Sequence, residues 1–290
     1  MRQKCNQLVS ILIIVILLPC IITVFLNGPS VLTNAKIGND YIKVKQKNGT
    51  AEVSLDTYCM GILAKEMDIT YEEEALKAQA LLVRTSVYKQ MTEHGKEVVF
   101  EEGYWTENHM EEYWGKSYKK NYGKLQNAWE STAGQVVTYN GQPAYVPFHQ
   151  LSNGSTRSGK EMLQTEEYPY LLAKECPKDI EAKGQLQTVM LPKKAYEIVS
   201  KDSAGYILEV KEGEESFTGE AFREKYGLPS SSFELQEYEG KIRITTKGVG
   251  HGLGMSQYTA NEMAKEKKTY QEILQYFFEG TEVKEVAQIL

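Results

Sequence analysis

Cysteine is scarce in this 290-residue chain, which has four, at positions 5, 20, 59 and 176. Two of them lie in or beside an apolar N-terminal segment, and no Cys-x-x-Cys pair occurs. This distribution argues against a disulfide framework. A single bond between Cys59 and Cys176 stays open, because sequence spacing does not reveal the Cα geometry that a disulfide needs.

Dense blocks of positive charge are also absent. The 33 lysines and arginines are scattered among 39 acidic residues, and the formal net charge is -6. Nucleic acid is therefore not an expected partner, since binding to its phosphates needs a basic face or run. No repeat or low-complexity segment follows residue 36, and 41% of residues are hydrophobic. The length and composition allow one large or two modest hydrophobic cores, and the lack of repeats favours one α+β domain.

The one long apolar run covers residues 8–26 and contains no charge. Nineteen helical residues span about 28 Å, close to the thickness of a bilayer core, and Arg2 and Lys4 before the run favour an N-inside orientation. We therefore predict a cytoplasmic N-terminus at 1–7, a transmembrane anchor at 8–26, a linker at 27–39 and an extracytoplasmic domain at 40–290. A cleaved signal peptide is the alternative, although its only small-residue exit is at 33–35.

Apolar periodicity and turn residues predict short strands and several helices beyond residue 40. A hairpin is expected over 41–55, with its turn at 48–49, and a strand over 135–139 is followed by a turn at 139–142. A further strand is expected at 144–149, a polar loop at 152–159 and several short segments at 189–244. Helices are predicted at 55–67, 71–94, 127–133, 218–226, 256–265 and 270–279. The fold class is α+β, a single mixed domain behind one N-terminal transmembrane helix.

Glu66 stands at the end of the first predicted helix and precedes an amphipathic one. Lys77, Arg84 and Tyr88 lie seven and four residues apart, so they share one stripe of the 71–94 helix. A carboxylate lying against such a stripe would be oriented by it. Composition alone favours the simpler interpretation of a surface carboxylate beside a solvated helix face.

A second segment, 148–156, takes a strand ending in Phe148 and His149 into a loop of hydroxyl and amide side chains. Neutral donors and acceptors around a glycine suit sugar hydroxyls, although loops of this kind are commonly ordinary turns. His149 has no second histidine, cysteine or carboxylate nearby at ligand-like spacing, so we interpret it as a structural histidine and predict no metal.

A third segment, 248–257, alternates glycine with other residues around His251. Alternate glycines allow another strand or a ligand to approach the backbone closely, and the helix that follows offers oriented amide groups. The spacing superficially matches dinucleotide-binding loops. No parallel βαβ unit surrounds it, so that interpretation is rejected.

The order of these segments and their residue sequences resemble the stage II sporulation protein D family, also called the SpoIID/LytB domain, over residues 40–285. Its entry motif is matched by Leu55-Asp56-Thr57-Tyr58, its Ala-x-Glu-Met by Ala64-Lys65-Glu66-Met67, and its Glu-Ala-Leu-Lys-Ala-Gln-Ala by residues 74–80 with Arg84-Thr85 downstream. The middle motif is matched by Phe148, His149, Ser152, Gly154 and Thr156, and the C-terminal motif by Gly250, His251, Gly252, Gly254, Met255, Ser256 and Gln257.

The resemblance implies a lytic transglycosylase that cleaves the MurNAc-GlcNAc β-1,4 bond of peptide-stripped glycan strands to 1,6-anhydro products, during engulfment in sporulation. Glu66 matches the catalytic glutamate, and we expect it in a partly apolar pocket, as suits a general acid. Lys77 and Arg84 match positions expected to orient Glu66 or the substrate. The other expected substrate-binding residues are His149, Ser152, Thr156, His251, Ser256 and Gln257. No cofactor is implied.

The chain departs from a zinc-binding variant of the family, because Ser155 stands at one candidate ligand position and no cysteine lies between 59 and 176. The implied partners are peptidoglycan, the membrane, a sporulation amidase and a multi-pass membrane protein of the engulfment complex. The implied location is the septal or forespore-engulfing cell membrane. Two other functions stay open: a non-catalytic glycan-binding or amidase-enhancing module, and an anchored scaffold for other wall enzymes.

Overall fold

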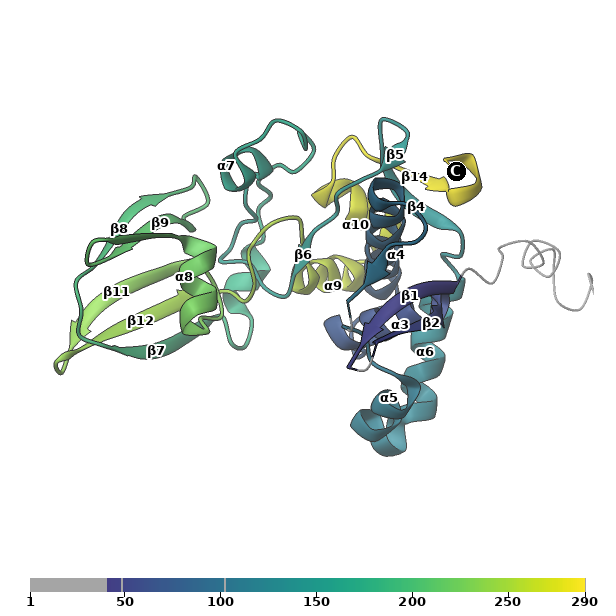
Figure 1. Cartoon of the computed structure of the whole chain (residues 1–290), viewed down its shortest axis with the longest axis horizontal. Helices are drawn as coiled ribbons and strands as arrows, with labels where there is room; N and C mark the ends of the chain where they lie inside the picture. The colour runs from purple at the N-terminus through teal and green to yellow at the C-terminus, as the bar shows by residue number, and fades with distance from the viewer. Residues whose placement is uncertain (1–40, 48, 102, 290) are drawn as a thin grey trace, which may run out of the picture. The chain divides into compact units, whose positions relative to one another are not determined.

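The structure is a computed structural model that describes residues 41–47, 49–101 and 103–289. The predicted cytoplasmic N-terminus, transmembrane anchor and linker lie outside these residues. Among the described residues, no helix combines the length and apolar character needed to cross a bilayer. From Ile42 onward the chain forms one compact unit that mixes helices with short strands (Figure 1), which confirms the α+β class.

The first half of the described chain is mainly helical, and α4 lies at its centre. Its elements are β1 (Tyr41–Gln46), β2 (Gly49–Ser54), α3 (Leu55–Glu66), α4 (Glu73–His94), β3 (Val99–Phe100), α5 (Glu107–Trp114), η1 (Gly115–Ser117), α6 (Tyr118–Glu130), β4 (Gln135–Tyr139), β5 (Gln142–Pro143) and β6 (Phe148–His149). Helix α4 packs against α3, α6 and β4, and against two helices from the C-terminal end of the chain.

The second half alternates strands with short helices. Its elements are α7 (Gly159–Leu163), η2 (Pro177–Glu181), β7 (Leu186–Pro192), β8 (Tyr196–Lys201), β9 (Ile207–Glu212), β10 (Glu215–Thr218), α8 (Gly219–Tyr226), β11 (Phe233–Tyr238), β12 (Lys241–Lys247), β13 (Met255–Ser256), α9 (Gln257–Lys265), α10 (Tyr270–Phe277), β14 (Glu282–Glu285) and η3 (Val286–Gln288). Strands β10-β9-β8 and β11-β12-β7 form two antiparallel sheets, and the C-terminal strand β14 returns to pair with β4.

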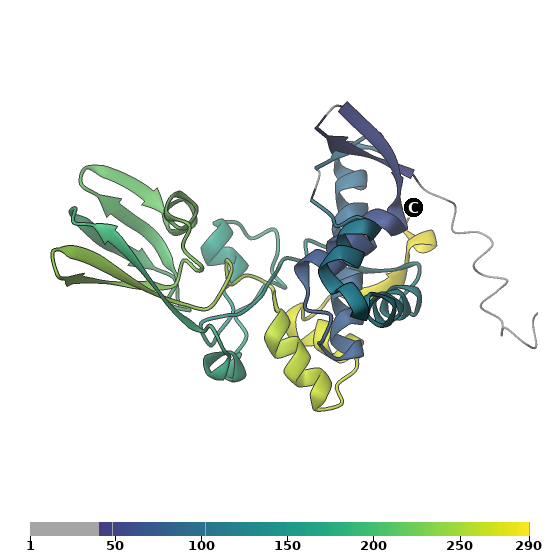
Figure 2. The ribbon, with the colours of Figure 1, turned by 90° about the horizontal axis from the view of Figure 1, so that it is seen from below.

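Two hydrophobic clusters form inside the compact unit. The larger gathers side chains of the helical half together with α9 and α10. The smaller has Phe222 of α8 at its centre, packed against Ile207, Val210, Phe233 and Ile244 of the two antiparallel sheets. We call the second cluster and its strands, residues 186–247, the β module; Figure 2 shows its sheets with α8 beside them.

Several local predictions are confirmed by cap and turn geometry. Ser54 accepts a hydrogen bond from the Thr57 N–H at the start of α3, and Gly95, at φ 84°, ends α4. The turn after β4 has φ 51° at Asn140 and 76° at Gly141, which suits an Asn-Gly pair between antiparallel strands. The helix predicted at 218–226 is α8, and Thr218 is its N-cap, accepting from the N–H of Ala221.

The prediction was wrong in two places. A helix was expected only at 127–133, whereas α6 begins at Tyr118 and α5 precedes it. Helix α5 buries only Met110, and α6 buries only Leu125, Ala128 and Trp129, so few core residues marked this stretch as helical. The strand expected at 144–149 is limited to β6, because the N–H of Tyr145 donates to the hydroxyl of Tyr170 rather than to a neighbouring strand.

Candidate active site

The side chain of Glu66 lies at the C-terminal end of α3 and is 41% exposed. Its one ion-pair contact within the described residues is with the Nζ of Lys65, at 3.8 Å. The surroundings are therefore more open than the partly apolar pocket that we predicted. A carboxyl group in this position is accessible to a polymer approaching from solvent.

The C-terminal motif reaches Glu66 through Gln257, the first residue of α9. The side-chain amide of Gln257 donates to the backbone carbonyl oxygen of Glu66 at 2.9 Å and to Oε1 of Gln79 in α4 at 3.2 Å. Gln257 is buried. It therefore fixes the end of α3, rather than lying free to bind a sugar as predicted.

The middle and C-terminal motifs are joined by a short parallel ladder and by a buried carboxylate. Ser256 of β13 pairs with His149 of β6. The carboxylate of Asp179 accepts hydrogen bonds from the N–H of Ser152 at 2.7 Å, the hydroxyl of Ser256 at 2.7 Å and the hydroxyl of Thr259 at 2.6 Å. Burial raises the pKa of Asp179, although these hydrogen bonds act in the opposite direction. The three segments singled out in the sequence thus meet around α3, α4 and α9.

The glycine-rich segment has the close backbone approach that its sequence predicted, and the approaching group is a strand. A Cβ on Gly254 would lie 2.0 Å from the carbonyl oxygen of Pro147, and one on Gly250 would lie 2.7 Å from the Cβ of His149. Both glycines have positive φ, 72° and 107°. Only glycine combines this conformation with this contact.

His149 is buried and His251 is half-buried, and their ring centroids lie 5.9 Å apart. The Nδ1 of His149 lies 3.1 Å from the carbonyl oxygen of Leu253, and its Nε2 has no partner within the described part of the chain. Burial lowers the pKa of His149 to about 3, with a smaller contribution from His251. The Nδ1 of His251 accepts from the N–H of Leu253, and burial lowers its pKa too.

Arg84 and Lys77 lie elsewhere than predicted. The guanidinium of Arg84 is buried and donates to the carbonyl oxygens of Trp129, Thr132 and Gln135 at 2.7 to 3.2 Å, so it caps the C-terminal end of α6. Burial lowers the pKa of Arg84 to about 10. Arg84 therefore contacts the end of α6 and not Glu66 within the described residues, and its expected role toward a substrate stays a prediction.

The ammonium of Lys77 contacts Glu73 at 2.9 Å and Glu74 at 2.8 Å within its own helix, not Glu66. Ser152, Thr156 and Ser256 are also buried, and Thr156 accepts from the N–H of Lys174 at 2.8 Å. These buried groups support the fold of the site. Their predicted contacts with the sugar stay a prediction.

Comparison with known proteins agrees with these motifs. The family described as "SpoIID: Stage II sporulation protein" matches residues 43–139. Stage II sporulation protein D of Bacillus subtilis (strain 168) is 33% identical over 263 residues, covering 82% of this chain and 76% of that protein. The chain belongs to the stage II sporulation protein D family. Its counterpart in Bacillus amyloliquefaciens is 32% identical over the same shares of the two chains.

Membership of the stage II sporulation protein D family supports a cell-wall-related role in sporulation. A second protein of Bacillus subtilis (strain 168), an amidase enhancer, is 28% identical over 291 residues, covering 76% of this chain and 39% of that protein. Both Cys59 and Cys176 are buried free thiols, so no bond joins them. Within the described ranges, no group of three or more His, Cys, Asp or Glu is arranged to hold a metal.

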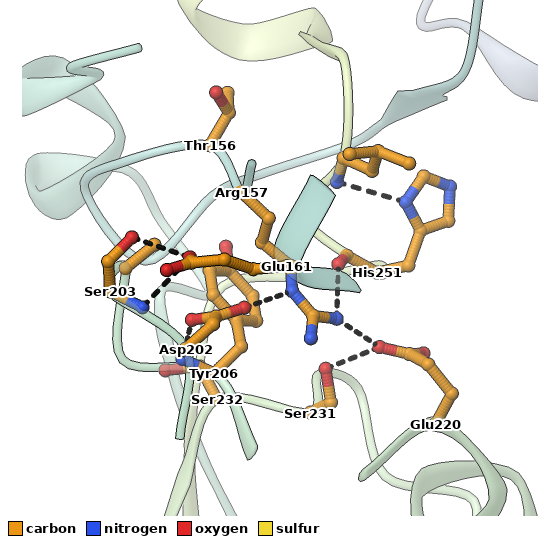
Figure 3. Close-up of polar contacts among 12 residues, drawn as sticks. Thr156, Arg157, Glu161, Asp202, Ser203, Tyr206, Glu220, Ser231, Ser232 and His251 are labelled. Carbon is orange, nitrogen blue, oxygen red and sulfur yellow. Dashed lines mark hydrogen bonds and ion pairs between the residues drawn. The ribbon is translucent and has the colours of Figure 1, made fainter. Parts of the chain in front are cut away.

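Sequence reasoning missed Asp179 and the buried ion pairs of Arg157. Asp179 is one of 39 acidic residues and stands in no motif, and Arg157 lay unremarked in the predicted 152–159 loop. The charge of Arg157 inside a loop of neutral polar residues was the available signal. The guanidinium contacts Asp202 at 2.5 Å and Glu220 at 2.8 Å, as Figure 3 shows.

Proposed function

We propose that this protein is a peptidoglycan lytic transglycosylase with Glu66 as its acid and base. The observation that carries the proposal is the position of Glu66: an accessible carboxyl group at a helix end, tied by Gln257 to the C-terminal motif. The resemblance of the surrounding motifs to the family supports the assignment. The substrate is the MurNAc-GlcNAc β-1,4 bond of glycan strands stripped of stem peptides, during engulfment.

The proposed reaction needs one carboxyl group. Protonated Glu66 gives its proton to the glycosidic oxygen as the bond from that oxygen to C1 of the muramoyl sugar breaks. The resulting carboxylate then takes the proton of the same sugar's 6-hydroxyl, while O6 bonds to C1 and closes a 1,6-anhydro ring. Glu66 ends protonated, as it began, and no water is consumed. A hydrolase would instead use a pair of carboxyl groups.

The cellular setting is part of the same proposal. Residues 8–26 anchor the chain in the septal or forespore-engulfing membrane with the N-terminus inside, and the domain from residue 40 lies outside the cytoplasm. A sporulation amidase supplies stripped strands, and a multi-pass membrane protein shares the engulfment complex. The likeness to an amidase enhancer supports an amidase as partner.

The test is mass spectrometry of products released from peptide-stripped strands by the full-length chain and by Glu66→Gln. We expect 1,6-anhydro ends from the parent and a loss of at least about 100-fold in the variant, since a positioned acid-base group contributes that much. Glu101→Gln, an exposed carboxylate outside the three motifs, is the control and retains the parent rate. Reducing ends in place of anhydro ends would show a hydrolase.

The second candidate is a non-catalytic module that enhances an amidase, favoured by the likeness to the amidase enhancer. In that case neither the parent chain nor Glu66→Gln releases products from stripped strands. Added to a purified cell-wall amidase, both proteins would then raise the rate of stem-peptide release equally.

A further inference from the structure

A cavity of about 360 Å³ lies where the middle-motif loop meets the β module. Six of the residues that line it have polar or charged side chains: Asn153, Ser155, Lys201, Ser232, Glu234 and Lys247. They come from the loop after β6, the end of β8, the start of β11 and the end of β12. None of them was predicted as a site residue, and none forms a hydrogen bond or ion pair with Glu66 within the described residues.

The walls of this cavity are joined to one another by Asn153. Its backbone N–H donates to the hydroxyl of Tyr206 at 3.0 Å. Its side-chain amide donates to the carbonyl oxygen of Ala204 at 2.8 Å and to the hydroxyl of Ser232 at 2.9 Å. One residue of the motif loop thus fixes both the β8–β9 turn and the strand beside it.

A buried ion pair also fixes the β8–β9 turn (Figure 3). The Nε of Arg157 donates to Oδ2 of Asp202 at 2.5 Å, and Oδ1 of Asp202 accepts from the N–H of Tyr206 at 2.8 Å. The side chains of Arg157 and Asp202 are 2% and 0% exposed. A site with walls fixed in this way loses little conformational entropy when a ligand binds.

The charge at the cavity is unbalanced. Lys247 forms an ion pair with Glu234 at 2.7 Å, and that hydrogen bond, assisted by the positive charges of Lys247 and Lys201, lowers the pKa of Glu234. The backbone of Lys201 pairs with Ile207 in the β8–β9 ladder, whereas its ammonium group forms no hydrogen bond or ion pair within the described residues. Two ammonium groups therefore face one carboxylate, with amide and hydroxyl groups between them. This set suits a ligand that carries one negative charge among hydroxyl and acetamido groups.

We propose that this cavity binds the free lactyl carboxylate of a muramic-acid unit of the glycan strand. The proposal rests on the proposed function, because it names a substrate subsite outside the reacting bond. On a stripped strand every second sugar carries this carboxylate, whereas a stem peptide converts it into an uncharged amide. A cavity with one excess positive charge therefore distinguishes stripped strands from peptide-bearing ones.

The test measures binding by the full-length chain, purified in detergent and carrying Glu66→Gln so that strands are not consumed. The ligands are peptide-stripped strands, peptide-bearing strands, chitin oligosaccharides of matched length, which lack the lactyl group, and free stem peptide. We expect the stripped strands to bind most tightly. Added salt should weaken their binding more than that of chitin oligosaccharides.

The decisive variant is Lys201→Gln with Lys247→Gln, compared with Lys211→Gln with Lys241→Gln, which removes two charges from the same module outside the cavity. The cavity variant should bind stripped strands about tenfold more weakly, as expected for two partly exposed ion pairs, and chitin oligosaccharides unchanged. The control variant should bind both as the parent does.

Three results would overturn the proposal. These are unchanged binding of stripped strands by the cavity variant, an equal loss for chitin oligosaccharides, and a loss confined to peptide-bearing strands or free peptide. The last result would assign the cavity to the carboxylate of the stem peptide. Binding and product analysis are separate measurements, so a chain that releases no anhydro products can still pass or fail this test.

Discussion

Asp179 illustrates, at the scale of single residues, why the serines of two motifs are needed. Its carboxylate accepts from the backbone of Ser152 and from the hydroxyls of Ser256 and Thr259, all inside the protein. A buried carboxylate is tolerated only when such donors surround it. The small hydroxyl residues of the motifs therefore serve the interior, although their sequence context suggested sugar contacts.

His149 gives a pH prediction at this scale. The pKa of His149 is about 3 in the folded chain, below the ordinary value near 6.5. Between these two pH values the unfolded chain therefore binds a proton at His149 and the folded chain does not. The stability contributed by neutral His149 is complete above about pH 6.5 and is lost as the pH falls towards 3. Between pH 8 and pH 5.5 the expected loss from this group is about 1.4 kcal/mol.

The measurement is urea unfolding of the parent and of His149→Asn at several pH values. The amide of the asparagine keeps a donor for the carbonyl oxygen of Leu253, but it does not titrate. The parent should lose about 1.4 kcal/mol more than the variant between pH 8 and pH 5.5. Because His251 and the carboxylates are present in both proteins, their contributions cancel, and parallel pH curves would contradict the prediction.

What the sequence reveals at the residue scale is which positions matter, more than what each one does. The motif resemblance singled out Gln257 and Arg84, and both make several buried hydrogen bonds. Most of their partners are backbone carbonyl oxygens, which carry no sequence signature, and Gln257 also donates to the side-chain Oε1 of Gln79. Asp179 could not be distinguished from other carboxylates, since its burial depends on contacts with residues 27 to 80 positions away.

At the scale of elements, the glycine segment between β12 and α9 is held by two separate constraints, conformation and contact. Gly254 has φ 72° and the carbonyl oxygen of Pro147 would lie 2.0 Å from an added Cβ. Gly240, in the β11–β12 turn, has φ 71° with no atom within 4 Å of an added Cβ. An alanine at either position would therefore adopt the same unfavourable backbone conformation. Only at position 254 would its Cβ also clash with another atom.

Replacing each glycine by alanine separates these constraints. Gly240→Ala should cost about 1 kcal/mol, the penalty for a left-handed alanine. Gly254→Ala should cost at least about 3 kcal/mol, because the backbone at Pro147, just before β6, must also move away. Unfolding free energies from urea titration give the comparison, and equal costs at the two positions would show that the Pro147 contact is not rigid.

Long helices with many buried residues are the elements that sequence patterns predict well here. Helix α4 has twelve buried residues and a glycine stop, and it was predicted to within two residues. Helix α5 buries only Met110, and its Tyr113 packs on Trp105, which precedes the helix, with ring centroids 4.6 Å apart. Such helices are stabilised by tertiary contacts that periodicity does not record.

At the scale of the whole molecule, the main question is how the β module is attached to the helical half. The buried side chain of Arg157 contacts both parts. It contacts Asp202 and Glu220 of the β module and donates to the carbonyl oxygen of His251 in the glycine segment at 3.3 Å. A single mixed domain was predicted, and the two hydrophobic clusters inside it were not visible in the sequence.

Arg157→Met therefore tests whether the two clusters unfold together. Removing the guanidinium leaves the buried carboxylate of Asp202 without its cation, and breaking such a pair costs about 3 to 5 kcal/mol. The loss should fall on the β module, so amide hydrogen exchange should rise in residues 207–212 and 241–247 before it rises in α4. Arg157→Met with Asp202→Asn should recover part of the loss, because no uncompensated charge is then buried. A uniform rise of exchange across α4 and the β module would show that the two clusters unfold as one cooperative unit, and the cavity between loop and module would then share the stability of the active-site helices.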